Sequence, residues 1–369
     1  MNCLRILPGL ILFTAASGAW AGSCSYNAGN PTGNAPLIAT MPLAVGSITV
    51  GRDVPLGTEV YRQTFHPSSN FRIFCPSSVA AIIRSRTFAE TPLPLSGWSG
   101  SPYGGRVYET GVRGIGVVIL HEGKALPHHQ SPMTNQCGGQ TNCNWTALAR
   151  LNAFDLSFIK IGEVLPGVIQ GASLPTAQSD WTTGSALTLL RMSVSGAIGV
   201  VSRTCKTADV PVELGTHQAR DLKGPGSATP WKDFEIRLLD CPAFHGYYTS
   251  SGPIWYPNGD STPGTPTGNV LRYRLDPTNG AIDMLGGVIR LNASAPGGAA
   301  AATGIGIQIA DRSGTPVPLS TLAKGPDVAS SGNEGASYSI PLRARYLQTG
   351  STVTPGPANG AVTFTIDYQ

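Results

Sequence analysis

The 369-residue chain has few charged side chains, few aromatic side chains and no pattern that predicts long helices. Charged residues make up 12% of the chain, aromatic residues 7%, and the formal net charge is +4. Basic residues such as Arg84, Arg86, Arg106 and Arg113 are scattered singly. We therefore expect no nucleic acid or other polyanion as a partner. Because apolar residues do not recur with a helical period, the pattern also excludes a helical bundle.

Long apolar runs are missing as well. Beyond the N-terminus, no stretch reaches the roughly 18 uninterrupted apolar residues that a membrane-spanning helix needs. The N-terminus reads MNCLRILPGLILFTAASGAWA, with Arg5 as its one charged side chain, an apolar stretch, and small residues at Ala19 and Ala21. This arrangement predicts a secretory signal peptide over residues 1–21 and a mature chain that starts near Gly22. We expect the protein to be exported from the cytoplasm and to be secreted via the periplasm.

The sequence gives little support for catalysis. Acidic residues are sparse, and no close pair of them predicts glycoside hydrolysis. The segment GWSGS at residues 97–101 departs from the nucleophile-elbow pattern because its last position is serine. His66, His121, His128 and His129 lie in the first half, but their spacing matches no zinc motif. We predict a protein that is not an enzyme and has no cofactor or metal, with a histidine-bound zinc left open as an alternative.

Glycine and proline are abundant, with 46 and 30 residues, and short apolar runs lie between them. This composition favours many short strands joined by turns. About 350 residues remain after the signal peptide, which is too many for one sandwich. One plan occurs twice: GSITVG, FRIFC and GVRGIGVVIL in the first half, and DVPVELG, FEIRLLDC and GIGIQIAD in the second, where Val210, Val212 and Leu214 alternate. We predict an all-β protein with two immunoglobulin-like β-sandwiches, residues 22–198 and 199–369.

Cysteines support the same division. Six remain after the signal peptide, and an even number in an exported chain indicates disulfides. Six cysteines allow about fifteen pairings. We favour sequential pairing because each pair then falls inside one pattern, and a thiolate metal site is the alternative. The predicted disulfides are Cys24–Cys75, Cys137–Cys143 and Cys205–Cys241.

The chain ends on a predicted strand, VTFTIDYQ. Apolar Val362, Phe364, Ile366 and Tyr368 alternate with polar residues. Strict alternation predicts a half-buried strand whose apolar face needs a sheet to lie on. No later strand follows that could cover it. In the preceding strand, YSIPLRARY, Pro341 cannot donate to a ladder, which predicts an edge strand or a bulge at that point.

Five segments, in order, resemble a type 1 fimbrial pilin domain over residues 199–369: DVPVELG after Cys205, FEIRLLDCP, GIGIQIADRSGTPVPL, PLRARYLQTGSTVTPGPANG and VTFTIDYQ. The resemblance implies a sandwich that lacks its final strand and has a hydrophobic groove beside its last one. A periplasmic chaperone fills such a groove, and at the outer-membrane usher the donor strand of an adjacent subunit replaces it. The resemblance also implies that the groove is lined by Val362, Phe364, Ile366 and Tyr368.

Single-domain pilins of this family carry a donor extension before the first cysteine. Here about 175 residues of another predicted domain occupy that place, an arrangement that resembles the two-domain tip adhesins of chaperone/usher fimbriae. The resemblance implies a position at the fibre tip on the bacterial surface. It also implies an N-terminal domain, 22–198, that binds a host or surface receptor, often a carbohydrate. Two alternatives stay open: a structural minor pilin that initiates assembly, and an adhesin that binds a protein.

Two segments of the first half combine aromatic and short polar residues, as carbohydrate sites do. The first, PLSGWSGSPYGGRVYET, contains Trp98, Tyr103 and Tyr108. The second, HHQSPMTNQCGGQTNCNWT, contains Asn142, Asn144 and Trp145 beside the Cys137–Cys143 pair. We expect these six residues to include ligand-binding ones. A turn that packs its own tryptophan, and a purely structural disulfide, are the respective alternatives.

Overall fold

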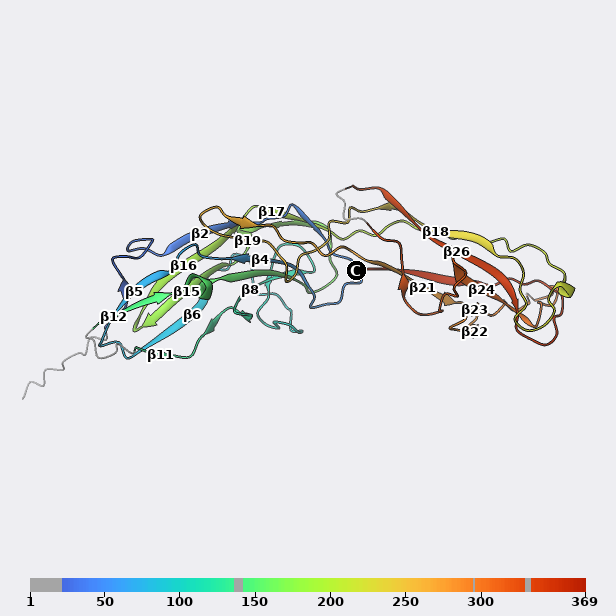
Figure 1. Cartoon of the computed structure of the whole chain (residues 1–369), viewed down its shortest axis with the longest axis horizontal. Helices are drawn as coiled ribbons and strands as arrows, with labels where there is room; N and C mark the ends of the chain where they lie inside the picture. Colours follow the sequence, from blue (N-terminus) through green and yellow to red (C-terminus); the bar gives the residue numbers. More distant parts are fainter. Residues whose placement is uncertain (1–21, 136–141, 295, 329–332) are drawn as a thin grey trace, which may run out of the picture.

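A computed structural model describes residues 22–135, 142–294, 296–328 and 333–369. The chain forms two β-rich halves arranged end to end in an elongated molecule, and the C-terminus lies between them (Figure 1). Strands dominate the described residues, and helix is limited to three short 3₁₀ turns, η1 (Ala149–Asn152), η2 (Gly171–Ser173) and η3 (Ala219–Asp221). No helix in this part of the chain is long and apolar enough to cross a membrane. The prediction of an all-β protein is confirmed.

The front half, at the N-terminal side, contains two large sheets and two small ones. One large sheet has the order β10-β6-β15-β16-β2, with β11 also on β6. Its strands are β2 (Leu37–Pro42), β6 (Ala81–Glu90), β10 (His128–His129), β11 (Met133–Thr134), β15 (Thr176–Thr183) and β16 (Ser185–Ser195). The small sheets are β1-β5-β12 and β14-β17-β3. They consist of β1 (Ser25–Tyr26), β3 (Ser47–Thr49), β5 (Phe71–Pro76), β12 (Asn142–Ala147), β14 (Gly167–Gln170) and β17 (Ala197–Val201).

The second large sheet of the front half has the order β20-β19-β4-β13-β8-β7, with β9 on β8. Its strands are β4 (Glu59–Phe65), β7 (Tyr108–Glu109), β8 (Ile115–His121), β9 (Lys124–Ala125), β13 (Phe154–Lys160), β19 (Ile254–Trp255) and β20 (Ser261–Thr262). Strands β19 and β20 come from the second half of the sequence. The sequence pattern predicts one rear domain over all of residues 199–369 and contains no signal that β19 pairs with β4 of the front half.

The rear half is a sandwich of two sheets. The larger has the order β18-β26-β24-β23-β22 and the smaller β25-β21-β27. Their strands are β18 (Lys232–Cys241), β21 (Leu271–Pro277), β22 (Ala281–Asp283), β23 (Val288–Ile289), β24 (Ile305–Asp311), β25 (Ala323–Lys324), β26 (Ala336–Gln348) and β27 (Val362–Tyr368). β17 precedes this half in the chain and pairs with β14 and β3, so the residues before Cys205 belong to the sheets of the front half.

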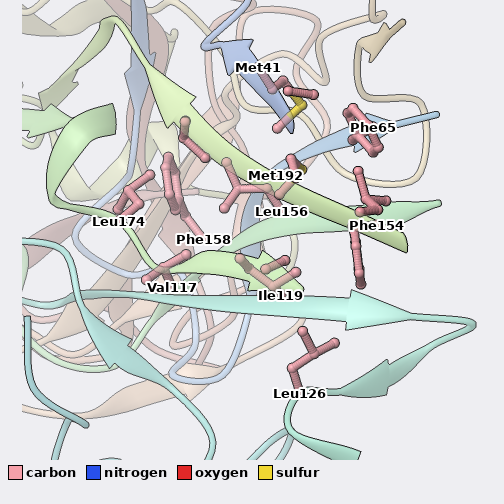
Figure 2. Close-up of a cluster of buried hydrophobic side chains, with 14 of the residues drawn as sticks. Met41, Phe65, Val117, Ile119, Leu126, Phe154, Leu156, Phe158, Leu174 and Met192 are labelled. Atoms are coloured by element: carbon pink, nitrogen blue, oxygen red, sulfur yellow. The ribbon is translucent and has the colours of Figure 1, made fainter. Parts of the chain in front are cut away.

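Each half has its own apolar core. The front core contains Phe65, Phe154, Leu156 and Phe158 among others, all fully buried (Figure 2). β8 is buried along its whole length because its two faces lie against different clusters. Ile115, Val117 and Ile119 face the main front core, whereas Val118 and Leu120 form a smaller cluster with Ile159. This explains a continuous apolar run where a half-buried strand would alternate.

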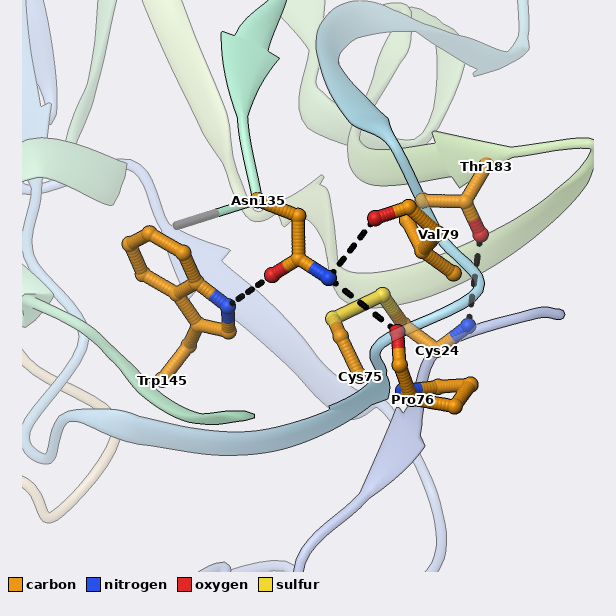
Figure 3. The surroundings of a disulfide bond; sticks show 7 residues. All are labelled: Cys24, Cys75, Pro76, Val79, Asn135, Trp145 and Thr183. Atoms are coloured by element: carbon orange, nitrogen blue, oxygen red, sulfur yellow. Dashed lines mark hydrogen bonds between the residues drawn. A yellow bond between two sulfur atoms is a disulfide. The ribbon is translucent and has the colours of Figure 1, made fainter. Parts of the chain in front are cut away.

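Between cysteines that both lie within the described residues, the structure shows two disulfides, and both are among the predicted pairs. Cys24–Cys75 joins the strand β1 region to β5, close to the hydrogen-bonded Asn135 and Trp145 (Figure 3). Cys205–Cys241 joins the start of the rear half to the end of β18. Cys137 lies outside the described residues, so the third predicted pair has no structural account.

The prediction of an edge or a bulge at Pro341 is confirmed as a local edge at that residue, although the strand as a whole is not an edge strand. β26 lies in the middle of its sheet, between β18 and β24. β24 pairs only with residues 342–348 of β26, so Pro341 lies beyond the end of β24 and is opposite Glu235 of β18 alone. The missing N–H therefore removes no bond to β24, and the proline is tolerated inside a long central strand.

Candidate functional site

The last strand, β27, has one free edge over most of its length. Within the described residues it pairs only with β21, from Leu271 opposite Tyr368 to Pro277 opposite Val362. The facing sheet ends at β18, whose ladder partner is β26. The sandwich is consequently open between β27 and β18. An unpaired edge next to an exposed core is a site where another strand can add.

A groove of about 320 Å³ lies at this opening. β27 contributes Val362 and Phe364 to its lining, and β18 contributes Phe234 and Ile236. The groove floor is made of core residues of the rear half, namely Leu275, Ile289, Ile307 and Ile309. The groove is large enough to hold water, but most of the side chains named above are apolar and offer water no hydrogen-bond partner. Apolar side chains from another strand would fill such a space more favourably than water.

The segment after Cys205 covers one side of the groove. Val210, Val212 and Leu214 line it, and these are the residues whose alternation predicts a strand. The prediction of a strand here is wrong, because residues 207–217 are in no ladder. The segment has the side-chain pattern of a strand but no hydrogen-bonding neighbour along this side of the opening. Sequence reasoning did not assign these residues to the groove, although their alternation was the available signal.

The four residues predicted for the groove occupy one face of β27 but divide into two groups. Val362 and Phe364 are half-buried and line the groove. Ile366 and Tyr368 are only 7% and 4% exposed and belong to the rear core. The Tyr368 hydroxyl accepts a hydrogen bond from the Cys205 backbone N–H at 3.0 Å, and burial raises the pKa of this hydroxyl. The open part of the strand is therefore its first half.

Residues of the front half occupy the free edge at the other end of β27. The Arg52 guanidinium donates to the Ile366 carbonyl at 3.0 Å. The Asp53 N–H donates to the Tyr368 carbonyl, and the Asp53 carboxylate accepts from the Tyr368 N–H, each at 3.0 Å. Gly51 has to be glycine for this contact, because a Cβ there would lie 2.2 Å from the Tyr368 carbonyl oxygen. An added strand can thus pair freely only with the stretch before Ile366.

Buried Lys160 supports this junction from the front half. Its Nζ donates to the carbonyls of Gly51 and Arg52 at 3.0 and 2.6 Å. The side chain is 3% exposed, and burial lowers the pKa of its ammonium. Asp53 in turn forms an ion pair with Arg52 at 3.0 Å and raises the pKa of that guanidinium. The junction is therefore held by charge-assisted hydrogen bonds, which are stronger than neutral ones.

The first predicted ligand-binding segment lies near the junction. The Trp98 indole N–H donates to the Pro102 carbonyl at 2.9 Å within the same loop. Tyr103 has a positive φ of 64° and packs on the small cluster around Val118. The loop packs directly against Gly57, because a Cβ on Gly57 would lie 2.2 Å from the Ser101 carbonyl oxygen. Tyr108 lies in β7 and packs in the main core.

The second predicted segment lies at the outer end of the front half, around β5 and β12 and far from the C-terminus (Figure 1). The Trp145 indole N–H donates to the Asn135 side-chain oxygen at 2.9 Å (Figure 3). The Trp145 ring contacts the Trp181 ring edge-on. Asn144 is exposed, and its side-chain oxygen accepts from Asn27 at 2.6 Å. Asn142 is in β12, opposite Pro76. The structure does not bring the two predicted segments together into one site.

The histidines of the front half do not converge on a common point. The His121 and His128 rings are 5.6 Å apart beside Arg86, a buried guanidinium whose pKa burial lowers to about 10. The His129 ring bonds to Ser85, and the His66 ring stacks on Tyr256. Among the described residues, no group of three or more His, Cys, Asp or Glu side chains is placed to hold a metal ion.

The sequence and the fold were compared with those of known proteins, and the half that contains the groove matches a protein family. Residues 192–369 match a family described as fimbrial protein. The type 1 fimbrial protein A chain of Escherichia coli K12 is 39% identical over 182 residues, which cover 46% of this chain and 79% of that protein. A fimbria adhesin protein of Klebsiella pneumoniae is 24% identical over 375 residues and is matched over 100% of both chains. A tip adhesin structure from Pseudomonas aeruginosa has 15% identity, 94% coverage of both chains and a TM-score of 0.35.

Proposed function

Because the chain belongs to the fimbrial protein family, we propose that it is an adhesin held at the tip of a fibre through its rear half. The groove beside β27 is the observation that carries this proposal. There a pilus chaperone, and then the donor strand of the adjacent fimbrial subunit after transfer at the outer-membrane usher, would add to the free edge. Alternate apolar side chains of the added strand would enter the groove. The route is through the periplasm to the bacterial surface.

The tip position follows from the way the chain enters the rear half. A subunit inside a fibre must both accept a strand and donate one. Here the residues before Cys205 form β16 and β17, which are paired in the sheets of the front half. They are therefore not free to add to a neighbour. The full-length similarity to a Klebsiella pneumoniae protein named fimbria adhesin supports the role of an adhesin.

We place the receptor contacts at the outer end of the front half, around Asn144. This end points away from the groove along the long axis of the molecule, so it would face outward when the rear half is attached to the fibre. Short polar side chains such as exposed Asn144 and half-buried Asn27 suit the hydroxyl groups of a carbohydrate. The contacts of Trp145 and the nearby Cys24–Cys75 disulfide hold this end in place, and a pre-ordered site loses less conformational entropy when a ligand binds. Trp98 and Tyr103 form a separate second candidate site near the junction.

Attachment of fimbriated bacteria to immobilised glycans tests both parts of the proposal. Asn144→Ala is expected to reduce attachment while fibres carry a normal amount of the protein at their tips. Ser99→Ala, an exposed change in the loop of Trp98, is the matched control and should attach normally. Phe364→Asp places a charge in the groove and should remove the protein from fibres altogether.

Three results would count against the proposal. Normal incorporation of the Phe364→Asp variant would overturn anchoring through the groove. Loss of attachment with Ser99→Ala, but not with Asn144→Ala, would move the receptor site to the loop near the junction. Normal attachment by fibres that lack the protein would leave a structural minor pilin as its role.

A further inference from the structure

A segment of the rear half, residues 245–265, crosses to the front half and becomes part of its sheet. We call this segment the strap. It leaves the rear half after the end of β18 and returns before the start of β21, and it includes β19 and β20. β19 runs parallel to β4, with Ile254 opposite Thr64 and Trp255 opposite Phe65. Figure 1 shows β19 beside β4 in the front half, far from the other rear strands.

Backbone hydrogen bonds along β4 show that the strap completes this edge. The Thr64 N–H donates to the Pro253 carbonyl and the His66 N–H to the Trp255 carbonyl, each at 2.9 Å. Farther back, the Tyr248 N–H donates to the Val60 carbonyl at 3.3 Å. Without the strap, the outer edge of β4 would present unpaired N–H and C=O groups over an apolar core. An edge of that kind is a site for non-specific pairing with other chains.

Aromatic side chains fix the strap on the front core. The Trp255 ring lies 6.0 Å from the Phe65 ring, and the Tyr248 ring contacts the Tyr61 ring edge-on at 6.1 Å. Phe65 and Tyr61 are both fully buried, and the two strap residues pack against the same core cluster. Aromatic pairs at such distances add to the stabilisation that burial gives. The strap therefore covers front core residues and is not a surface loop.

The strap is also anchored where it leaves the rear half. The Thr49 hydroxyl donates to the Ala243 carbonyl at 2.9 Å, and the Thr49 N–H donates to the Gly246 carbonyl at 3.0 Å. Closer to β19, Gly252 passes directly over β4, where a Cβ would lie 1.9 Å from the Arg62 carbonyl oxygen. This position has no room for any side chain, so the fit between strap and strand is specific.

We propose that the strap is a built-in strand donor that completes the front half, so that the front half is made of residues 22–203 together with 245–265. Neighbouring domains of one chain usually move relative to one another. Here a strand of the rear half is paired in a sheet of the front half, and this pairing restricts the motion of the two halves relative to one another. The front half expressed as residues 22–203 alone would lack the partner of β4. The proposal concerns the fold of the chain and stands apart from its role as an adhesin.

Amide hydrogen exchange on the full mature chain tests the strap directly. In the parent, the amides of Thr64 and His66 are expected to be protected, because the strap carbonyls are their acceptors. Gly252→Ala should raise exchange at both amides at least tenfold, while amides in β18 and β26 keep their protection. Gly97→Ala is the matched control, since a Cβ at that glycine meets no atom within 4 Å and should leave exchange unchanged.

Trp255→Ala is the second variant, for use if Gly252→Ala does not accumulate. It removes the ring that contacts Phe65 but keeps the backbone bonds, so we expect a smaller rise, of about threefold, at His66. Fast exchange of Thr64 and His66 in the parent would overturn the proposal. So would unchanged protection in both strap variants. Failure of the adhesin proposal would appear in the attachment assay and would leave these exchange rates as they are.

Discussion

Removal of the Phe364 ring should weaken strand addition in the groove by about 30-fold. Phe364 is half-buried in the free chain and borders about 320 Å³ of unfilled space, so it becomes fully buried only when a strand occupies the groove. Replacing a fully buried phenylalanine by alanine costs about 3–5 kcal/mol. If about half of that is lost only in the complex, the affinity falls by about 2 kcal/mol. A difference of 1.4 kcal/mol is about tenfold in Kd.

Titration of the purified mature chain with a synthetic peptide measures this effect. The peptide alternates valine and threonine over about ten residues, with lysines at both ends for solubility. Thr363→Ala is the control, because Thr363 is exposed on the opposite face of β27. Binding of the Phe364→Ala variant within threefold of the parent would refute the assignment of Phe364 to the groove. An equal loss with Thr363→Ala would show that the wrong face of β27 had been assigned.

Three further predictions concern stability. Burial lowers the pKa values of the His121 and His128 rings, which lie beside cationic Arg86. Folding then favours the neutral rings, so thermal melting should show full stability above about pH 6.5 and a loss of stability as the pH falls through the lowered pKa values of the two rings. His128→Gln should make this loss of stability smaller. Replacing Cys205 and Cys241 by serine opens a 36-residue loop and should cost the rear half about 4 kcal/mol in denaturant unfolding, with the front half unaffected. Asp53→Ala should speed amide exchange at Tyr368, because the Asp53 carboxylate accepts the hydrogen bond of the Tyr368 N–H. Unchanged exchange at Tyr368 would contradict this contact.

The sequence predicted the local elements of this fold well because their signals are local. Alternation over residues 362–368 predicted β27 and the face of it that is buried. The apolar run ending at Cys241 predicted β18, and the order of the cysteines predicted the Cys24–Cys75 and Cys205–Cys241 pairs. Glycine, proline and the missing helical period predicted an all-β chain. The strand inferences depend on residues a few positions apart, the fold class on composition, and the disulfide pairs on the order of the cysteines along the chain.

The candidate site was only partly predictable from the sequence. The pattern placed Val362, Phe364, Ile366 and Tyr368 on one face but could not show which of them are covered. The rear core encloses Ile366 and Tyr368, and Arg52 and Asp53, more than 300 positions away in the chain, bind the backbone at this end of the strand. An aromatic residue among polar ones has the same sequence pattern in a packed loop and in a binding site, so the pattern alone does not decide between these two roles for Trp98 and Trp145.

The sequence by itself determined the all-β class, several of the longer strands with the faces they bury, the family, and the strand over residues 362–368. Only the tertiary structure decided how the halves are joined, since β19 carries too few residues for a periodic signal and is recognised only by its pairing with β4. Hydrogen bonds between distant segments depend on where the rest of the chain places them. For that reason the strap and the junction at Asp53 could not be found in the sequence, whereas the strand that ends the chain could.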